Sequence, residues 1–237
     1  MKQIFFYISI IFSISVFGNE IKFYGTAMDL KTGKFVYTDN HKEKYQNGVH
    51  VSSVISYKDS SGKEFANKVI EFTPNASVPN FTFFDLRDGY TEGGKKTGNA
   101  IKLFYRRKST DSLSEKVLNV DKWNVLDGGF DYFVRENWEN FSDERKISFE
   151  FLVPVELGEF GFRVYKLRDD VVLGREAIVL RMEIDNFIFR SFIRPITIAY
   201  DKKTKRILQY EGISNINDEN GKSLNVKITY TYPNNVL

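Results

Sequence analysis

The chain has 237 residues, and its 34 Lys and Arg against 31 Asp and Glu give a formal net charge of +3. So small an excess of positive charge argues against a nucleic-acid partner or a strongly charged substrate. The chain has no cysteine, which excludes disulfides and thiol nucleophiles, while its 22 Phe and 13 Tyr suit β-strands or an apolar cavity.

The start of the chain has the pattern of a signal peptide, which we place at residues 1–18. Lys2 is the one charge, an apolar run follows, and Val16-Phe17-Gly18 suits cleavage before Asn19. A membrane anchor is the alternative, but it would need about twenty apolar residues, more than this run provides. We therefore expect an exported protein, periplasmic in a Gram-negative host and otherwise secreted, with residues 19–237 forming one β-rich domain.

Short apolar runs between turn signals predict strands through the first half of the chain. The expected strands cover residues 21–29, 34–45, 49–58, 64–72, 81–84, 99–107 and 115–120. Residues 87–98 form an expected polar, glycine-rich connection. Within it, Gly93 to Gly98 superficially resembles a phosphate loop, but the motif spacing and a clear following helix are missing. We predict a solvated turn there.

The Asn47-Gly48 pair predicts a hairpin whose register decides which side chains face inwards. A two-residue loop would pair Tyr45 with His50. A three-residue loop pairs Tyr45 with Val49 and gathers Tyr37, Tyr57 and other apolar side chains on one face. We favour the three-residue loop. It places His41 on the apolar face with Asp39 and Glu43, and it turns His50 to the opposite face.

Residues Asp127 to Phe141 are the clearest amphipathic helix in the chain. Apolar side chains recur at the helical period of about 3.6 residues. This apolar stripe consists of Phe130, Phe133, Val134, Trp138 and Phe141. Asp127 is a plausible N-cap, because its carboxylate can accept a free backbone N–H of the first turn. An amphipathic helix among strands is expected to bury its stripe on the concave face of a curved sheet.

The second half again has a hairpin rhythm. Strands are predicted at residues 146–154, 160–167, 174–185, 195–200, 206–213 and 223–232, with a short helical turn at 187–192. No Pro- or Ser-rich linker divides the chain. The predicted fold class is mainly β: a curved antiparallel sheet, or open half-barrel, built from hairpins with one amphipathic helix on its concave face.

Few residue patterns point to chemistry. The two histidines are placed too far apart to share a metal ion, and no nucleophile motif is present, so we expect no metal and no cofactor. A polar cluster follows an aromatic strand and could form the rim of a site. It consists of Asp85, Arg87, Asp88 and Glu92, with His41 as a further candidate. Paired carboxylates can act as acid and base, but we favour the interpretation that these residues cap a turn and pair with one another.

The predicted architecture resembles the half-barrel of the periplasmic lipoprotein carriers of the localisation pathway. The resemblance rests on the export signal, the hairpins in both halves, the inserted helix and the final meander. The segment ILQYEGISNI, Ile207 to Ile216, is similar to segments near the ends of uncharacterised exported bacterial proteins. The resemblance implies a helical plug over an apolar cavity. The cysteine that anchors a lipoprotein is absent.

Three functions compete on this pattern. The first is a non-enzymatic binding or carrier protein for a lipid or other apolar small molecule, with peripheral contact to the envelope membrane and no nucleic-acid partner. Its expected ligand contacts are Phe130, Phe133, Val134, Trp138, Phe141, Tyr37 and Tyr57. The same aromatics could instead fill a solid core. The second is a hydrolase-like enzyme using the polar cluster. The third is a small outer-membrane β-barrel, against which the 27% of charged residues counts.

Overall fold

The computed structural model describes residues 18–72, 74–141, 145–186, 188, 194–233 and 236. The predicted signal peptide lies outside these ranges except for Gly18, and the turn predicted at 187–192 lies outside them except for Ile188. No helix in this part of the chain is both long and apolar enough to cross a bilayer.

The described residues form a mainly β structure of fifteen strands in one sheet. In the first half the strands are β1 Gly18–Asp29, β2 Phe35–Gln46, β3 Val49–Lys58, β4 Glu64–Glu71, β5 Asn80–Asp85, β6 Thr91–Thr97, β7 Ala100–Arg106 and β8 Ser114–Asn119. In the second half they are β9 Asn124–Val125, β10 Ile147–Val153, β11 Gly158–Val172, β12 Arg175–Ile184, β13 Ile196–Asp201, β14 Ile207–Asn217 and β15 Ser223–Thr231.

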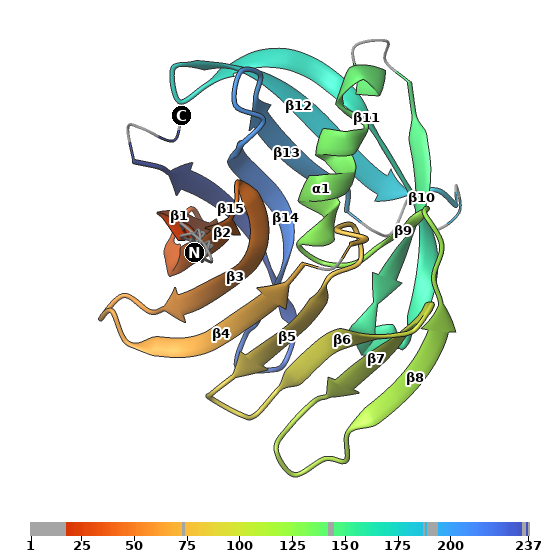
Figure 1. The fold of residues 1–237 in the computed structure, drawn as a ribbon. Coiled ribbons are helices and arrows are strands. Elements are labelled where there is room, and N and C mark those ends of the chain that lie inside the picture. The colour runs from red at the N-terminus through yellow and green to blue at the C-terminus, as the bar shows by residue number, and fades with distance from the viewer. Residues whose placement is uncertain are drawn as a thin grey trace, which may run out of the picture.

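The sheet consists of two meanders joined where the first and last strands pair. Its order runs from β8 down to β1, then through β15 down to β9, so β8 and β9 are its two free edges. Neighbouring strands of the described sheet pair antiparallel, except β9 with β10, which pair parallel. Figure 1 shows the sheet curled so that the helix α1 lies inside its curve. The sheet is open and is not closed into a barrel, which confirms the predicted fold class.

The two ends of the sheet approach each other without strand pairing. The turn η2, Pro154–Glu156, joins β10 to β11 and contacts β6 and β7 on the opposite end of the sheet. Leu157 after this turn packs against the apolar cluster of the first meander. Packing of side chains therefore brings the two ends of the curled sheet together.

The observed pairing of β2 with β3 differs from the predicted register. Its loop has two residues, Asn47 and Gly48, both with positive φ, as the tight hairpin turn requires. Tyr45 therefore pairs with His50, and the predicted three-residue loop is wrong. A bulge follows, because Lys44 pairs with Ser52 instead of Val51.

The bulge decides the orientation of both histidines. It restores the alternation that the prediction needed, so His41 lies opposite Ile55 and Asp39 opposite Tyr57, with Tyr37 on the same inner face. His50 was predicted to face outwards, and this is wrong. Its ring stacks on Tyr45 at 4.8 Å between centroids and faces the interior.

The predicted solvated turn at Gly93 to Gly98 is wrong in its first part, since Thr91–Thr97 forms β6 and Gly93 and Gly94 are buried. Residues 95–98 are exposed, and Gly98 and Asn99 form the turn after β6. A Cβ on Gly93 would collide with the ring of Phe104, and one on Gly94 would collide with Leu126. These glycines allow close packing in a strand interior rather than marking a loop.

The predicted helix is shorter than the expected range. α1 covers Gly129–Glu136, and a 3-10 turn, η1 Trp138–Phe141, continues it. The side chain and the backbone N–H of Asn137 both donate to the Phe133 carbonyl, which ends the regular helix. The N-cap is Gly128, so the predicted N-cap position of Asp127 is wrong by one residue. The carboxylate of Asp127 accepts the backbone N–H of Gly128 at 2.7 Å.

The apolar stripe of α1 packs on the second meander. Phe133, Val134 and Phe141 are fully buried, and Phe130 and Trp138 join the same cluster. Their partners on the sheet are Phe149, Val164, Ile178, Leu180, Met182, Ile198 and Tyr200. A second cluster, centred on β2–β7, fills other parts of the first meander. The helix therefore covers the concave face of the sheet mainly on the side of β10–β13.

Candidate functional site

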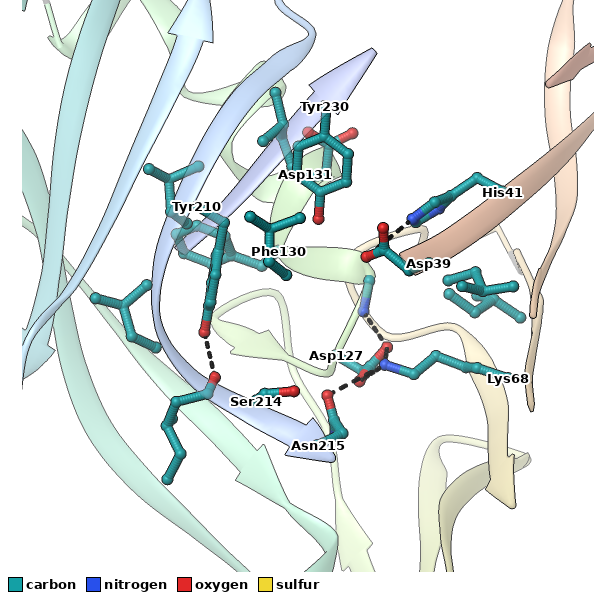
Figure 2. Close-up of a pocket in the computed structure, with 18 of the residues that line it drawn as sticks. Asp39, His41, Lys68, Asp127, Phe130, Asp131, Tyr210, Ser214, Asn215 and Tyr230 are labelled. Carbon is teal, nitrogen blue, oxygen red and sulfur yellow. Dashed lines mark hydrogen bonds and ion pairs between the residues drawn. The ribbon is translucent and has the colours of Figure 1, made fainter. Parts of the chain in front are cut away.

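A cavity of about 250 Å³ lies beside the first turn of α1, on the concave face of the sheet (Figure 2). β2, β3 and β4 form one wall, and β12 to β15 form the other. Its apolar lining consists of Ile55, Ile70, Phe130, Phe151, Met182, Ile196, Ile198, Ile207, Ile213 and Ile228. A second cavity of about 120 Å³ shares His41, Ile55 and Tyr230 with the first, so the two adjoin.

The start of the helix is held in place by the loop before β5. The backbone N–H of Leu126 donates to the carbonyl of Ser77 at 2.9 Å. A Cβ on Gly129 would collide with that same Ser77 carbonyl, so only glycine allows the helix to begin so close to the loop. This contact fixes the first turn of α1 at the end of the cavity.

Asp39 is the most buried carboxylate in the first cavity, with 4% of the residue exposed. Its Oδ2 lies 3.4 Å from His41 Nε2. Gly25 on β1 lies directly opposite, and a Cβ there would collide with Asp39 Oδ1. The absence of a side chain at Gly25 therefore makes the room in which this carboxylate lies.

Three tyrosines surround Asp39. Burial raises the pKa of Tyr37, Tyr57 and Tyr230 well above the usual value of a phenol, and the negative charge of Asp39 adds to each increase. The Tyr37 hydroxyl hydrogen-bonds with Ser214 Oγ at 2.9 Å. All three phenols therefore stay neutral and can act as hydrogen-bond donors and aromatic walls at neutral pH.

A buried polar network lines the cavity next to the start of the helix. Lys68 donates to both carboxylate oxygens of Asp127, at 2.9 and 2.7 Å, and to Asn215 Oδ1 at 3.3 Å. Asn215 and Tyr90 in turn donate to Glu92. Burial raises the pKa of Glu92, which favours its neutral form. This network connects β4, β6 and β14 with the residue that precedes the helix.

The second cavity is lined by a separate group of paired charges. Arg206 donates to Glu43 Oε2 at 2.7 Å and to the Tyr45 hydroxyl at 3.1 Å. Burial opposes ionisation of Glu43, but the charge of Arg206 outweighs it, and the pKa of Glu43 is lowered. Arg135 pairs with Asp131 on the same face of α1. The charges of this cavity are thus balanced by partners within the chain.

Of the residues predicted to contact a ligand, three line the first cavity: Phe130, Tyr37 and Tyr57. The other predicted contacts, Phe133, Val134, Trp138 and Phe141, belong to the cluster between helix and sheet. They line neither cavity described above. That these seven residues contact a ligand stays a prediction. In the structure, three of them line the first cavity and four lie in the cluster between helix and sheet.

The residues predicted to form a polar rim do not come together around the cavity. His41 lines both cavities, whereas Asp85, Arg87, Asp88 and Glu92 line neither. Asp85 accepts from the Arg87 guanidinium at 2.6 Å, and Asp88 Oδ1 accepts from the backbone N–H of Tyr90. Glu92 is buried in the network of Lys68. The first three therefore form the turn between β5 and β6.

The sequence prediction missed Lys68, Asp127, Asn215 and Tyr230 as cavity residues. Lys68 had a recognisable signal, because it alternates with Ala66 and Ile70 and so takes an inward position in β4. The ion pair of Lys68 with Asp127 joins residues 59 positions apart, which no local pattern indicates. In the described part of the chain, no group of three potential metal ligands occurs.

Comparison with known proteins yields no matching family model and no matching curated protein. Among solved structures, the chain is similar to a beta-barrel-like protein of the domain of unknown function DUF1849 from Brucella abortus. The identity is 9%, the TM-score is 0.50, and the match covers 92% of this chain and 98% of that one. This likeness shows a shared fold.

A second solved structure is a putative outer membrane lipoprotein-sorting protein domain from Vibrio parahaemolyticus. The identity is 7% and the TM-score 0.29, over 93% of this chain and 87% of that one. A match at this TM-score carries no argument about the fold or the function of this chain. The class defined by fold and cavity is an open, curled β-sheet protein with a helix inside its curve.

Proposed function

We propose that this protein is a non-enzymatic binding or carrier protein for a lipid-like or other apolar small molecule, and that it acts after export from the cytoplasm. The cavity of about 250 Å³ beside the first turn of α1 supports the proposal most directly. Its lining is mostly isoleucine and aromatic side chains, with a few polar groups at defined places, as is usual for small-molecule sites.

The size of the cavity suits a short apolar ligand. An apolar cavity of about 150 Å³ accommodates a benzene molecule. The first cavity is larger than that, and the adjoining cavity adds about 120 Å³ of space. Each buried methylene of a ligand contributes about 0.8 kcal/mol of transfer free energy. A chain of several methylenes would therefore gain enough free energy to be retained.

The alternative functions have less support from the arrangement of residues. The turn residues Asp85, Arg87 and Asp88 pair with one another or with the backbone, away from both cavities. A strand that spans lipid must be paired on both sides. The described sheet has free edges at β8 and β9, so we do not propose an outer-membrane barrel.

A matched pair of substitutions tests the binding proposal. Ile55 and Ile178 are both 6% exposed, but Ile55 lines both cavities, whereas Ile178 lies in the helix-covered cluster. We expect Ile55→Phe to fill the space between the cavities and lower the affinity for an apolar fluorescent probe at least tenfold, with little loss of stability. Ile178→Phe should retain binding but lose about 1–3 kcal/mol through overpacking.

Binding and unfolding are measured on the same preparations, by probe fluorescence and by urea titration. Mass spectrometry of the purified protein would in addition detect an apolar molecule that co-purifies with it. Equal binding by Ile55→Phe and the unchanged protein would contradict a ligand site in this cavity. So would the failure of a series of apolar probes to bind the unchanged protein.

A further inference from the structure

The carboxylates that line the first cavity outnumber the basic side chains that neutralise them. Asp39, Asp127 and Asp131 all line it. Asp127 is paired with Lys68, and Asp131 is paired with Arg135. Within the described residues, no lysine or arginine forms an ion pair with Asp39. Its one charged neighbour is His41, whose imidazole is a cation only when protonated.

Asp39 is buried with His41 as its neighbour and with no lysine or arginine to neutralise it. The residue is 4% exposed, and its Oδ1 is a buried oxygen with no hydrogen-bond partner. A carboxylate in such a place is costly unless a cation or several donors satisfy it. The chain nonetheless leaves room for this side chain by having glycine at position 25. Oδ1 of this carboxylate can therefore accept a hydrogen bond from a bound ligand.

The surroundings of Asp39 are aromatic. The rings of Tyr37 and Tyr57 meet edge to face at 5.7 Å between centroids. Tyr230 lies edge-on to His41 at 5.8 Å. Figure 2 shows Tyr230 and Asp39 facing the same space beside the first turn of α1. Aromatic faces attract cations through their quadrupole, and cages of this kind bind ammonium groups.

The remaining polar groups do not favour an anion. Lys68 already donates to both oxygens of Asp127, so its charge is neutralised within the chain. A ligand carboxylate would add a further negative charge to a cavity in which no lysine or arginine is paired with Asp39. A neutral head group would leave Asp39 without a counter-ion.

We propose that the cavity binds an amphiphilic amine, with its ammonium group paired with Asp39 among Tyr37, Tyr57 and Tyr230. The apolar part of the ligand lies along the isoleucines of β13, β14 and β15. The inference rests on the proposed binding function and adds the chemical class of the ligand. Asp39 is then the counter-ion of the ligand, and the tyrosines are the walls that replace the water around its head group.

Three eight-carbon compounds that differ only in the head group test this assignment on the purified protein. Isothermal titration calorimetry at pH 7 would compare n-octylamine, n-octanol and n-octanoate. We expect octylamine to bind about tenfold tighter than octanol, and octanoate to bind most weakly. The comparison needs no variant, so it does not depend on the folding of a mutant.

Two variants then locate the amine. Asp39→Asn keeps the shape of the side chain and its place over Gly25, so it should remove the advantage of octylamine and leave octanol binding unchanged. Asp85→Asn is the control, because Asp85 is also buried but lines neither cavity. It should keep the preference for octylamine. Thermal unfolding of both variants checks that they are folded.

The possible outcomes separate this inference from the proposed function. If octanol binds and octylamine binds no tighter, or if octanoate binds tightest, the amine assignment is overturned and the apolar site stands. If Asp39→Asn retains the preference for the amine, Asp39 is not the counter-ion. If none of the three compounds binds, both the amine assignment and the proposed apolar site are overturned.

Discussion

Two regions on the concave face of the sheet differ in how they are filled. Under α1, the stripe residues pack with β10–β13 into an aromatic and aliphatic cluster that contains Phe133, Val134 and Phe141. Beside the first turn of the same helix, the sheet faces a cavity that is lined in part by the buried side chains of Asp39 and Lys68. α1 covers eight residues, about 12 Å of helix, and is too short to cover the whole curved face.

This difference explains where the buried charges lie. A filled cluster has no room to solvate or pair a charge, so apolar side chains occupy it. Around the two cavities, charges are paired with residues far away in the sequence, such as Lys68 with Asp127 and Glu43 with Arg206. Asp39 differs from these in that its partner is a histidine. The uncovered region therefore has the properties of a binding site, and the covered region those of a structural core.

Two phenylalanines one helical turn apart give the largest expected contrast. Phe133 lies wholly in the filled cluster, whereas Phe130 also lines the cavity. Phe133→Ala should lower the free energy of unfolding by about 4 kcal/mol, because it leaves a void in close-packed surroundings. Phe130→Ala should cost roughly half as much, since part of its ring already faces open space. Urea titration measures both. Equal losses would contradict the distinction between the regions.

Breaking the Lys68–Asp127 ion pair should give the next largest loss in the free energy of unfolding. Lys68→Met should cost about 3 kcal/mol, because it leaves the carboxylate of Asp127 buried without a cation. A double variant with Asp127→Asn should recover much of this loss, and asparagine also tolerates the positive φ of position 127. The matched control is Lys42→Met, whose pair with Glu20 is exposed. That variant should unfold like the unchanged protein.

A smaller, pH-dependent effect is expected at Glu92. Burial raises its pKa in the folded state, so between the ordinary carboxyl pKa and this raised value the folded protein binds more protons than the unfolded chain. Stability therefore falls as the pH rises through this window. Glu92→Gln should remove that fall, because its carbonyl can still accept from Asn215 and its NH2 group can donate to the Tyr90 hydroxyl.

Urea unfolding of the Glu92→Gln variant and the unchanged protein from pH 4 to pH 7 measures this contribution. The variant should gain stability relative to the unchanged protein as the pH rises. Glu71→Gln, an exposed position on β4, serves as the control and should show no such trend. A relative gain towards low pH would show that Glu92 is held as a carboxylate.

The local patterns of the sequence predicted most strands, because alternation along a strand follows from burial of one face. β3 was predicted with its observed bounds, and β15 ends within one residue of the prediction. β6 was missed because its glycines resemble a turn, and their role is visible only beside Phe104 and Leu126. The bulge between Lys44 and Tyr45 was missed for the same kind of reason, because pairing with the neighbouring strands decides the register.

The sequence alone determined that the chain builds a curved sheet from hairpins, with an amphipathic helix on its concave face. Periodicity and turn residues are local properties, and they suffice for that conclusion. Only the tertiary structure decided that the helix ends early, that the space beside its first turn stays open, and that Asp39 lies there without a permanent cation. Cavities and ion pairs depend on residues far apart in the chain, so they arise only when the sheet curls around the helix.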